Sequence, residues 1–319
     1  EPTGRENPEL LRLRHTHGHD FTIINGVGRI GWMTGGNAAR WKDEDMSDTF
    51  AARAVSFIER SAGGPFFLYL ATHGIHVPRV PHPRFAGRSA GGTRGDAIEE
   101  LDDLVAKVLA TLDRLKLAEN TLVIFTSDNG PWLNFGRHAG SAGPFREGKG
   151  TTWEGGVRVP FIIRWPGVVP AGKVTSALAG NLDVLPTLVE ACGATKPVLP
   201  IDGQSFLAAA KGTSAKAREN FAYYYGDKLE AVRVGKWKLH LPHTYRSYEN
   251  LVPAAVDGKP AKYNQGKVEW ALYDLEADEG ERNDVSAAQP QVVAELKAFA
   301  EAERKRMDEA KRPVGRVGN

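Results

Sequence analysis

Chemically reactive side chains follow two apolar runs of the sequence, directly after each run ends. His73 and His76 follow the first run, and Asp128 and Asn129 follow the second. If both runs are neighbouring parallel strands, their carboxyl ends meet at one edge of a sheet, where ligands bind in open α/β folds. We therefore expect these four side chains to converge on one rim.

These residue types suit the cleavage of an oxyanion ester. Carboxylate and amide oxygens are ligands for Ca²⁺, with Mg²⁺ as the alternative, although two such ligands are too few for a complete site. Lys149, in the glycine-rich loop 148–156, offers a fixed positive charge, and a histidine exchanges protons near neutral pH. A metal, a lysine and a histidine would together stabilise the charge that develops on a sulfate or phosphate ester.

Other polar residues are candidates for substrate binding. His138 and Arg146 lie on the same long loop as Lys149, and we expect them to reach the substrate. His19 ends the segment 14–20, in which three histidines alternate. This segment fits three interpretations: a zinc site, a loop that shapes the substrate cleft, or a polar surface loop.

The sequence pattern around these residues predicts an α/β fold, in which a mostly parallel sheet has helices on both faces. Continuous apolar runs typical of buried strands are followed by helical patterns with apolar stripes. The predicted strands are 65–71, 121–127 and 157–165, and the predicted helices are 48–60, capped by Ser47, 96–115 and 182–191.

Beyond a linker near 208–216, the pattern changes to short strands. Residues 231–234 and 237–241 alternate on either side of Gly235-Lys236, which predicts a hairpin with a two-residue turn. A further strand and a final helix are expected at 270–275 and 290–307. We therefore predict two domains, an α/β core over 1–217 and a small antiparallel sheet with one helix over 218–319.

The composition excludes several classes of function. Lys and Arg total 41 against 39 Asp and Glu, and they are interspersed, unlike the clustered basic face of a nucleic-acid-binding protein. No apolar run approaches the ~18 residues that span a bilayer. The one cysteine, Cys192, is expected to be a small buried residue of a helix.

Four segments, taken in order, resemble the type I sulfatases. The run 65–78 resembles the strand that leads to an active-site histidine, and 121–131 resembles the metal-binding strand of that family. Residues 148–160 resemble its lysine loop, and 272–285 its carboxy-terminal signature. The resemblance implies an alkaline-phosphatase-like fold, sulfuric ester hydrolysis, Ca²⁺ and a periplasmic or secreted location.

The resemblance also implies roles for individual residues. Asp128 and Asn129 would be two of four protein ligands of Ca²⁺, and Lys149 would contact the sulfate and the leaving oxygen. His76 would contact the sulfate and take the proton that frees it from the enzyme. His73 would be a neighbour in the substrate site.

The family pattern also requires residues that this sequence lacks. Its nucleophile is a formylglycine made within a Cys/Ser-x-Pro-x-Arg motif, which does not occur here, and its paired amino-terminal aspartates are also missing. We therefore expect the chain to be the carboxy-terminal part of an enzyme, inactive without its amino-terminal part. A carbohydrate sulfate is the expected substrate. A phosphate or phosphonate ester hydrolase and a non-catalytic sulfated-glycan binder are the alternatives.

Overall fold

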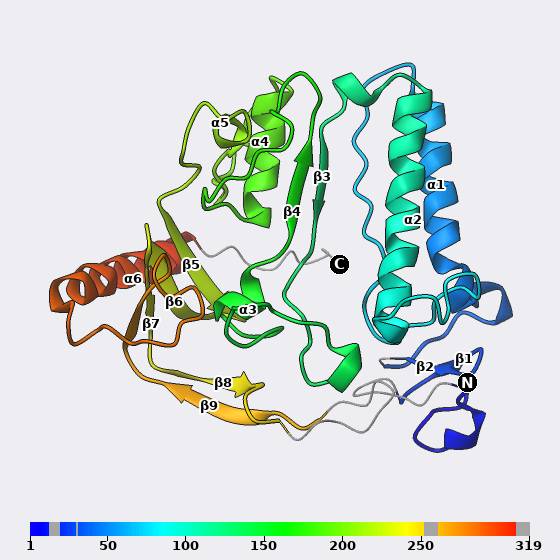
Figure 1. The fold of residues 1–319 in the computed structure, drawn as a ribbon, viewed down its shortest axis with the longest axis horizontal. Helices are drawn as coiled ribbons and strands as arrows, with labels where there is room; N and C mark the ends of the chain where they lie inside the picture. The colour runs from blue at the N-terminus through cyan, green and yellow to red at the C-terminus, as the bar shows by residue number, and fades with distance from the viewer. Residues whose placement is uncertain (13–19, 30, 252–260, 311–319) are drawn as a thin grey trace, which may run out of the picture. The chain divides into compact units, whose positions relative to one another are not determined.

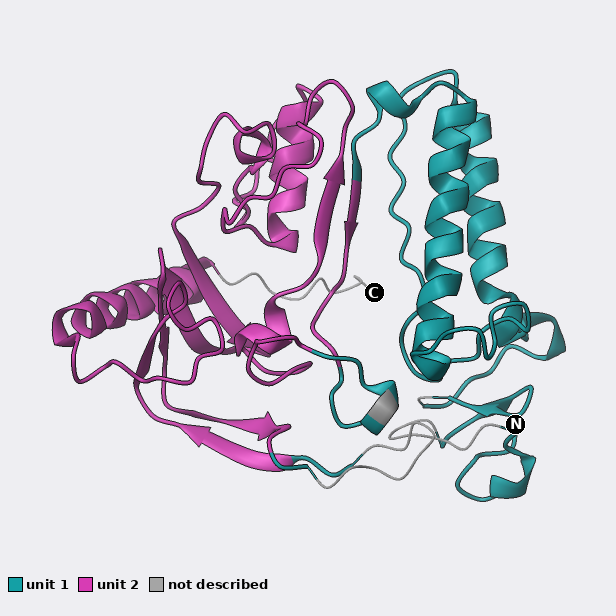
Figure 2. Ribbon diagram, in the orientation of Figure 1, with its two compact units in different colours: residues 1–123, 132–141, 250–263 teal, residues 124–131, 142–249, 264–319 magenta. Residues whose placement is uncertain are grey.

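The computed structural model describes residues 1–12, 20–29, 31–251 and 261–310 (Figure 1). The chain divides into two compact units, which Figure 2 shows in different colours. Unit 1 comprises Glu1–Val123, Trp132–Ser141 and Asn250–Tyr263, and unit 2 comprises Ile124–Pro131, Ala142–Glu249 and Asn264–Asn319. Among the described helices, none is long and apolar enough to cross a membrane.

Two paired helices dominate unit 1. Helix α1 (Met46–Ser61) packs along α2 (Gly92–Arg114), and small residues of α1, among them Ala51 and Ala54, are buried. The expected cap at Ser47 is wrong, because a 3₁₀ turn at Asp43–Asp45 leads directly into α1 and places Ser47 inside the helix.

The amino-terminal part of unit 1 forms a short hairpin. Strands β1 (Ile23–Ile24) and β2 (Val27–Gly28) pair in antiparallel register across Asn25-Gly26, both with positive φ. An Asn-Gly turn of this kind matches the right-handed twist of a hairpin.

The run 65–71 is extended but is assigned to no strand in the described structure. Phe66 packs edge-on against Phe57 of α1, with ring centroids 6.0 Å apart. Phe67 and Tyr69, on the opposite face, are 70% and 82% exposed. The expectation that both faces of this run are buried is therefore wrong: α1 packs against one face, and the other is open in the described structure.

Unit 2 contains the second half of the predicted α/β pattern. Strand β3 (Val123–Thr126) pairs with β4 (Phe161–Arg164), and the short helix α3 (Glu154–Val157) lies in the loop between them. Helices α4 (Val184–Ala191) and α5 (Leu207–Ala210) follow. Cys192 lies just after α4 and is exposed, so the expectation of a buried cysteine is wrong.

The predicted carboxy-terminal sheet is present. Its four strands run in the order β10-β7-β6-β5 and all pair in antiparallel fashion. Their bounds are β5 Asn220–Tyr225, β6 Lys228–Val234, β7 Trp237–His240 and β10 Ala271–Asp274. The turn Gly235-Lys236 joins β6 to β7, which confirms the predicted hairpin. Unit 2 runs across residue 217, so the boundary predicted there stays a prediction.

Helix α6 (Pro290–Ala310) covers one face of this sheet, as expected. Leu296 and Ala300 of α6 pack against an apolar cluster of the sheet that includes Val232, Leu239 and Leu272. A separate ladder, β8 (His243–Ser247) with β9 (Asn264–Val268), extends from the sheet and was not predicted. The opposite face of the sheet meets the loop that carries Lys149.

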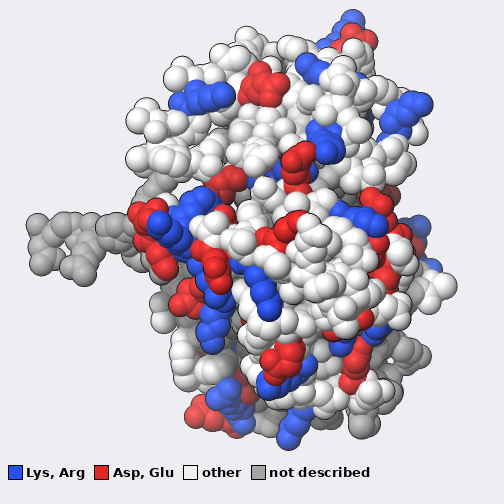
Figure 3. Space-filling model, turned by 90° about the vertical axis from the view of Figure 1, so that its left-hand side faces the viewer, with Lys and Arg blue, Asp and Glu red and all other residues white. Residues whose placement is uncertain are grey.

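The remaining turns are short 3₁₀ segments. They are Pro8–Leu10, Asn37–Ala39, Ala118–Asn120, Gly136–His138 and Asn181–Asp183. On the face shown in Figure 3, Lys and Arg side chains mix with Asp and Glu side chains. This mixture agrees with the near-neutral charge balance of the sequence.

Candidate functional site

The metal-ligand candidates and the lysine loop lie against each other within unit 2. The backbone N–H of Lys149 donates to the carbonyl of Pro131 at 2.9 Å, and that of Gly130 donates to the carbonyl of Gly156 at 2.9 Å. A Cβ atom at Gly130 would overlap the carbonyl oxygen of Gly155. Only glycine therefore allows the Asp-Asn turn to approach the lysine loop this closely.

The oxygens of the Asp-Asn pair suit a hard cation. Asp128 is exposed, and its Oδ1 accepts a long hydrogen bond of 3.4 Å from the Ser127 hydroxyl. The amide nitrogen of Asn129 donates to the carbonyl of Gly130 at 2.9 Å, which turns the amide oxygen toward other donors or a cation. This pair fits part of a Ca²⁺ site. Among the described residues no group of three His, Cys, Asp or Glu side chains could hold a metal ion.

The conformation of the lysine loop is fixed by its own glycines and threonines. Glu147 and Gly150 have positive φ values of 58° and 81°, so the chain turns sharply on both sides of Lys149. The Thr151 hydroxyl donates to the carbonyl of Gly148 at 2.9 Å. Lys149 is therefore presented from a tight turn rather than from a flexible loop.

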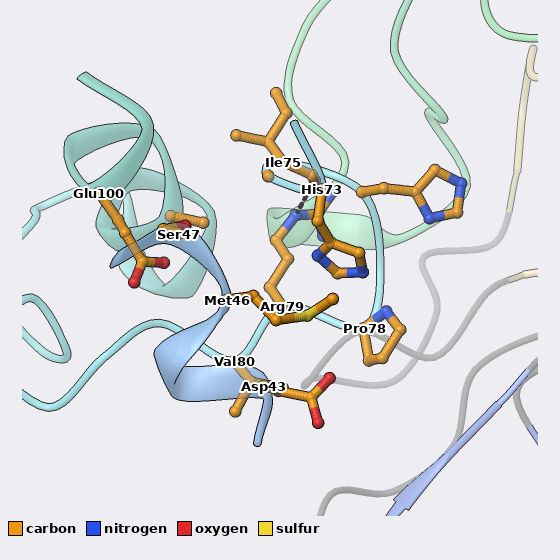
Figure 4. Close-up of a pocket in the computed structure, with 12 residues that line it drawn as sticks. Asp43, Met46, Ser47, His73, Ile75, Pro78, Arg79, Val80 and Glu100 are labelled. Atoms are coloured by element: carbon orange, nitrogen blue, oxygen red, sulfur yellow. Dashed lines mark hydrogen bonds between the residues drawn. The ribbon is translucent and has the colours of Figure 1, made fainter. Parts of the chain in front are cut away.

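The two histidine candidates lie in unit 1. His73 and His76 line a pocket together with Asp43, Arg79 and Glu100, and Figure 4 shows His73 and Arg79 as neighbours in it. Burial lowers the pKa of His73 below its ordinary value, although the nearby Asp43 carboxylate opposes the shift. This shift favours the neutral form of His73.

His76 has a defined orientation. Its Nδ1 lies 2.6 Å from the carbonyl oxygen of Val77, so Nδ1 carries the hydrogen of the neutral ring and Nε2 is the nitrogen without one. The ring of Trp132 lies 6.1 Å away, and Val77 packs against Phe135 and Ala139. These contacts hold the segment that carries His138 against the segment that carries His76.

Two charged residues of the pocket differ in their hydrogen bonding. Asp43 accepts hydrogen bonds from both terminal nitrogens of the buried Arg29, which neutralises its charge. Arg79 donates from Nε to the carbonyl of Ile75 at 2.9 Å, while its buried Nη1 finds no hydrogen-bond partner in the described part of the chain. Arg79 was not predicted, because an arginine between prolines gives no signal in the sequence.

Two further substrate-binding candidates are Arg146, which lies in unit 2, and His19. The Arg146 guanidinium stacks over Trp153 at 4.0 Å and donates to the Tyr245 hydroxyl at 3.1 Å and the Glu281 carbonyl at 3.2 Å. Both terminal nitrogens of Arg146 thus have hydrogen-bond partners within the protein. His19, with the histidine-rich segment around it, lies outside the described residues.

A buried charged network was missed by the sequence analysis. Lys238, His240 and Glu281 are fully buried and lie between the carboxy-terminal sheet and the lysine loop, where Glu154 joins them. The alternation in β7 could have revealed Lys238 and His240 as neighbours on one face.

Comparisons with known proteins agree with these motifs. The family model described as Sulfatase matches residues 11–194, and the model described as N-sulphoglucosamine sulphohydrolase, C-terminal, matches residues 147–306. An N-acetylgalactosamine-6-O-sulfatase of Bacteroides thetaiotaomicron is 41% identical over 314 residues, covering 94% of this chain and 59% of the relative. Human arylsulfatase A is 38% identical over 244 residues, covering 73% of this chain and 47% of the relative.

Comparison with solved structures also places this chain among the sulfatases. A structure from a study of the metabolism of multiple glycosaminoglycans by Bacteroides thetaiotaomicron superposes with a TM-score of 0.82 at 40% identity, covering 95% of this chain and 64% of the other. The PsFucS1 sulfatase of Pseudoalteromonas gives a TM-score of 0.76 at 27% identity, covering 90% and 58%. The chain thus spans between 47% and 64% of the length of these relatives and has their alkaline-phosphatase-like fold. With four ordered motifs, two matching family models and this fold, the chain belongs to the sulfatase family.

Proposed function

We propose that this chain forms part of a sulfuric ester hydrolase that removes sulfate from a carbohydrate. One observation carries the proposal: Gly130 and Pro131, directly after Asp128-Asn129, are hydrogen-bonded to the loop that presents Lys149. On this proposal, ligands for a divalent cation and a fixed positive charge would lie close together. Cleavage of a sulfate ester needs both, because negative charge builds up on the non-bridging and leaving oxygens.

Each candidate residue has a role in this proposal. Asp128 and Asn129 would contribute two of the ligands of a Ca²⁺ ion, which when bound supplies positive charge to polarise the ester. Lys149 would contact the sulfate and the leaving oxygen. His76 would take up a proton at Nε2, because Nδ1 already carries the hydrogen that it donates to the Val77 carbonyl.

The nucleophile is proposed to come from polypeptide outside these 319 residues. The sequence contains no Cys/Ser-x-Pro-x-Arg motif for a formylglycine, and Cys192 is followed by Gly193. The remaining metal ligands would come from the same amino-terminal part of the enzyme. On this proposal the 319-residue chain alone is inactive.

A hexosamine sulfate within a glycosaminoglycan is the proposed substrate. Relatives named as N-acetylgalactosamine-6-sulfatases support it. His73, His138, Arg146 and His19 remain the predicted substrate contacts, and Arg79 adds a donor in the pocket that His73 lines. A periplasmic or secreted location would bring the enzyme to such glycans.

Paired substrates test the reaction class. The catalytically complete protein, containing this chain, is assayed with 4-nitrophenyl sulfate and 4-nitrophenyl phosphate, and we expect higher kcat/KM for the sulfate. Preference for the phosphate would favour the phosphate ester hydrolase instead. Binding of a sulfated glycan with no turnover of either ester would favour a non-catalytic binder.

A further inference from the structure

The lysine loop is held by the carboxy-terminal sheet through charges that are fully buried. Lys238 Nζ of β7 lies 2.9 Å from a carboxylate oxygen of Glu154 and 2.9 Å from one of Glu281, and it donates to the Thr152 carbonyl at 2.8 Å. Thr152 and Glu154 belong to the lysine loop and to α3, whereas Glu281 belongs to the carboxy-terminal signature. One ammonium group therefore joins three segments.

Glu281 completes this junction. Its second carboxylate oxygen accepts a hydrogen bond from the backbone N–H of Glu154 at 2.7 Å, and its first also contacts His240 Nε2 at 2.9 Å. The His240 ring stacks on Trp153 with centroids 3.9 Å apart. A single glutamate thus fixes both the main chain and the aromatic side chain at the end of the lysine loop.

A second set of contacts acts on the residues beside Lys149. The Glu147 carboxylate accepts hydrogen bonds from the Ser247 hydroxyl at 2.7 Å and the Tyr248 backbone N–H at 2.6 Å. The Tyr248 hydroxyl then donates to the carbonyl oxygen of Lys149 itself at 2.6 Å. The main chain of Lys149 is therefore bound directly by the end of β8.

Stability alone does not explain these contacts. Removing charges from water costs free energy that an internal ion pair often fails to recover, and apolar residues of similar volume commonly serve as well. Buried, directional partners do offer a defined geometry for the segments that they join. A displacement of about 1 Å in a catalytic group can lower a rate by on the order of 10²-fold.

We infer that Glu281 and Tyr248 are positioning residues, which hold Lys149 in the geometry needed for sulfate ester cleavage. This inference rests on the proposed function of Lys149. It assigns a role to the carboxy-terminal signature, whose Glu281 contacts the loop rather than the substrate. Through Tyr248, it also makes the end of β8 part of the lysine site.

A double-mutant cycle tests this role in the catalytically complete protein. Tyr248→Phe removes one hydroxyl and should lower kcat with 4-nitrophenyl sulfate on the order of 10-fold, with KM changing less than about 2-fold. In a Lys149→Ala background the same change should have no further effect, because the positioned group is gone. An equal loss in both backgrounds would overturn the inference.

The matched control is Tyr224→Phe on β5. The Tyr224 hydroxyl has no hydrogen-bond partner within the described ranges, and its ring packs toward the α6 side of the sheet. This variant should leave kcat unchanged. A rate loss equal to that of Tyr248→Phe would contradict a specific role for Tyr248.

Hydrogen exchange separates this inference from the proposed function. In the 319-residue chain, Tyr248→Phe and Glu281→Gln should speed exchange of the Lys149 amide, which donates to Pro131, while the amides of β6 and β7 remain protected. If Glu281→Gln does not fold, the exchange rate of the Lys149 amide in Tyr248→Phe alone tests the inference. Unchanged exchange at Lys149 would overturn the inference whether or not the protein hydrolyses sulfate.

Discussion

At the scale of single residues, Lys149 is presented from a tight turn. Glu147 and Gly150 both have positive φ, and the Lys149 N–H is bound by Pro131. Its main chain is therefore ordered on both sides. A side chain held in this way can stabilise charge with little reorganisation during the reaction.

Replacing Lys149 should lower the rate far more than it lowers stability. In the catalytically complete protein, Lys149→Ala should reduce kcat with an aryl sulfate by on the order of 10²-fold or more, as for the loss of one oxyanion donor. Lys149→Arg should restore only part of the rate, since a planar guanidinium differs from a compact ammonium. The exposed Lys196 provides a control, and Lys196→Ala should retain full activity. A fully active Lys149→Ala enzyme would remove this residue from the mechanism.

His240 predicts how stability depends on pH. Burial lowers its pKa to about 4, although Glu281 opposes the shift and Lys238 and His243 add to it. Because the folded pKa lies below the ordinary value of 6.5, the neutral ring stabilises the fold fully above pH 6.5. This contribution is lost as the pH falls from 6.5 through 4, and it amounts to about 3 kcal/mol at most.

Urea unfolding of wild type and His240→Gln between pH 7.5 and 4.5 measures this effect. The free energy of unfolding of the wild type should fall more steeply with decreasing pH than that of the variant. Glu281 does not interfere, because its pKa is lowered to about 2 and its contribution is lost only below pH 4.5. Parallel pH profiles for the two proteins would show that His240 is not the titrating group.

At the scale of elements, the glycine of the Asp-Asn-Gly turn determines how closely β3 approaches the lysine loop. Gly130→Ala would place a Cβ against the Gly155 carbonyl and should destabilise the protein by about 1–3 kcal/mol. Gly63→Ala is the control, since nothing lies within 4 Å of its Cβ position. Thermal unfolding compares the two variants. Equal melting temperatures would show that the turn has room to move.

Periodicity predicted the regular elements better than the polar contacts between them. Alternation on either side of Gly235-Lys236 correctly predicted the β6–β7 hairpin, and the apolar positions after Pro290 correctly predicted α6. The β8–β9 ladder was missed because its register depends on long-range pairing, for example of His243 with Val268. Local sequence periodicity does not predict which distant strands pair.

The candidate site was predictable only where motifs are local. The Asp128-Asn129 turn and the Lys149 loop were identified separately, and the structure joins them through backbone hydrogen bonds. The network around Lys238 was missed, because Glu154, Lys238 and Glu281 are far apart in sequence. Charged residues so far apart in sequence give no local signal that the fold brings them together.

At the scale of the whole molecule, we propose that the chain provides only part of a metal site. Asp128 and Asn129 offer two oxygens, whereas Ca²⁺ takes six to eight ligands. The 319-residue chain should therefore bind Ca²⁺ with a Kd weaker than about 1 mM, measured by titration calorimetry. Asp128→Ala in the catalytically complete protein should weaken Ca²⁺ binding and lower kcat together. Micromolar binding by the chain alone would contradict the proposal that its remaining ligands lie elsewhere.

The most direct test of the central claim is the release of inorganic sulfate from a sulfated sugar. The catalytically complete protein is incubated with N-acetylgalactosamine 6-sulfate and, separately, with N-acetylgalactosamine 6-phosphate, and the released anion is measured by ion chromatography. The account predicts sulfate release that depends on Lys149 and little phosphate release. Phosphate release without sulfate release, or sulfate release that is unchanged in Lys149→Ala, would contradict it.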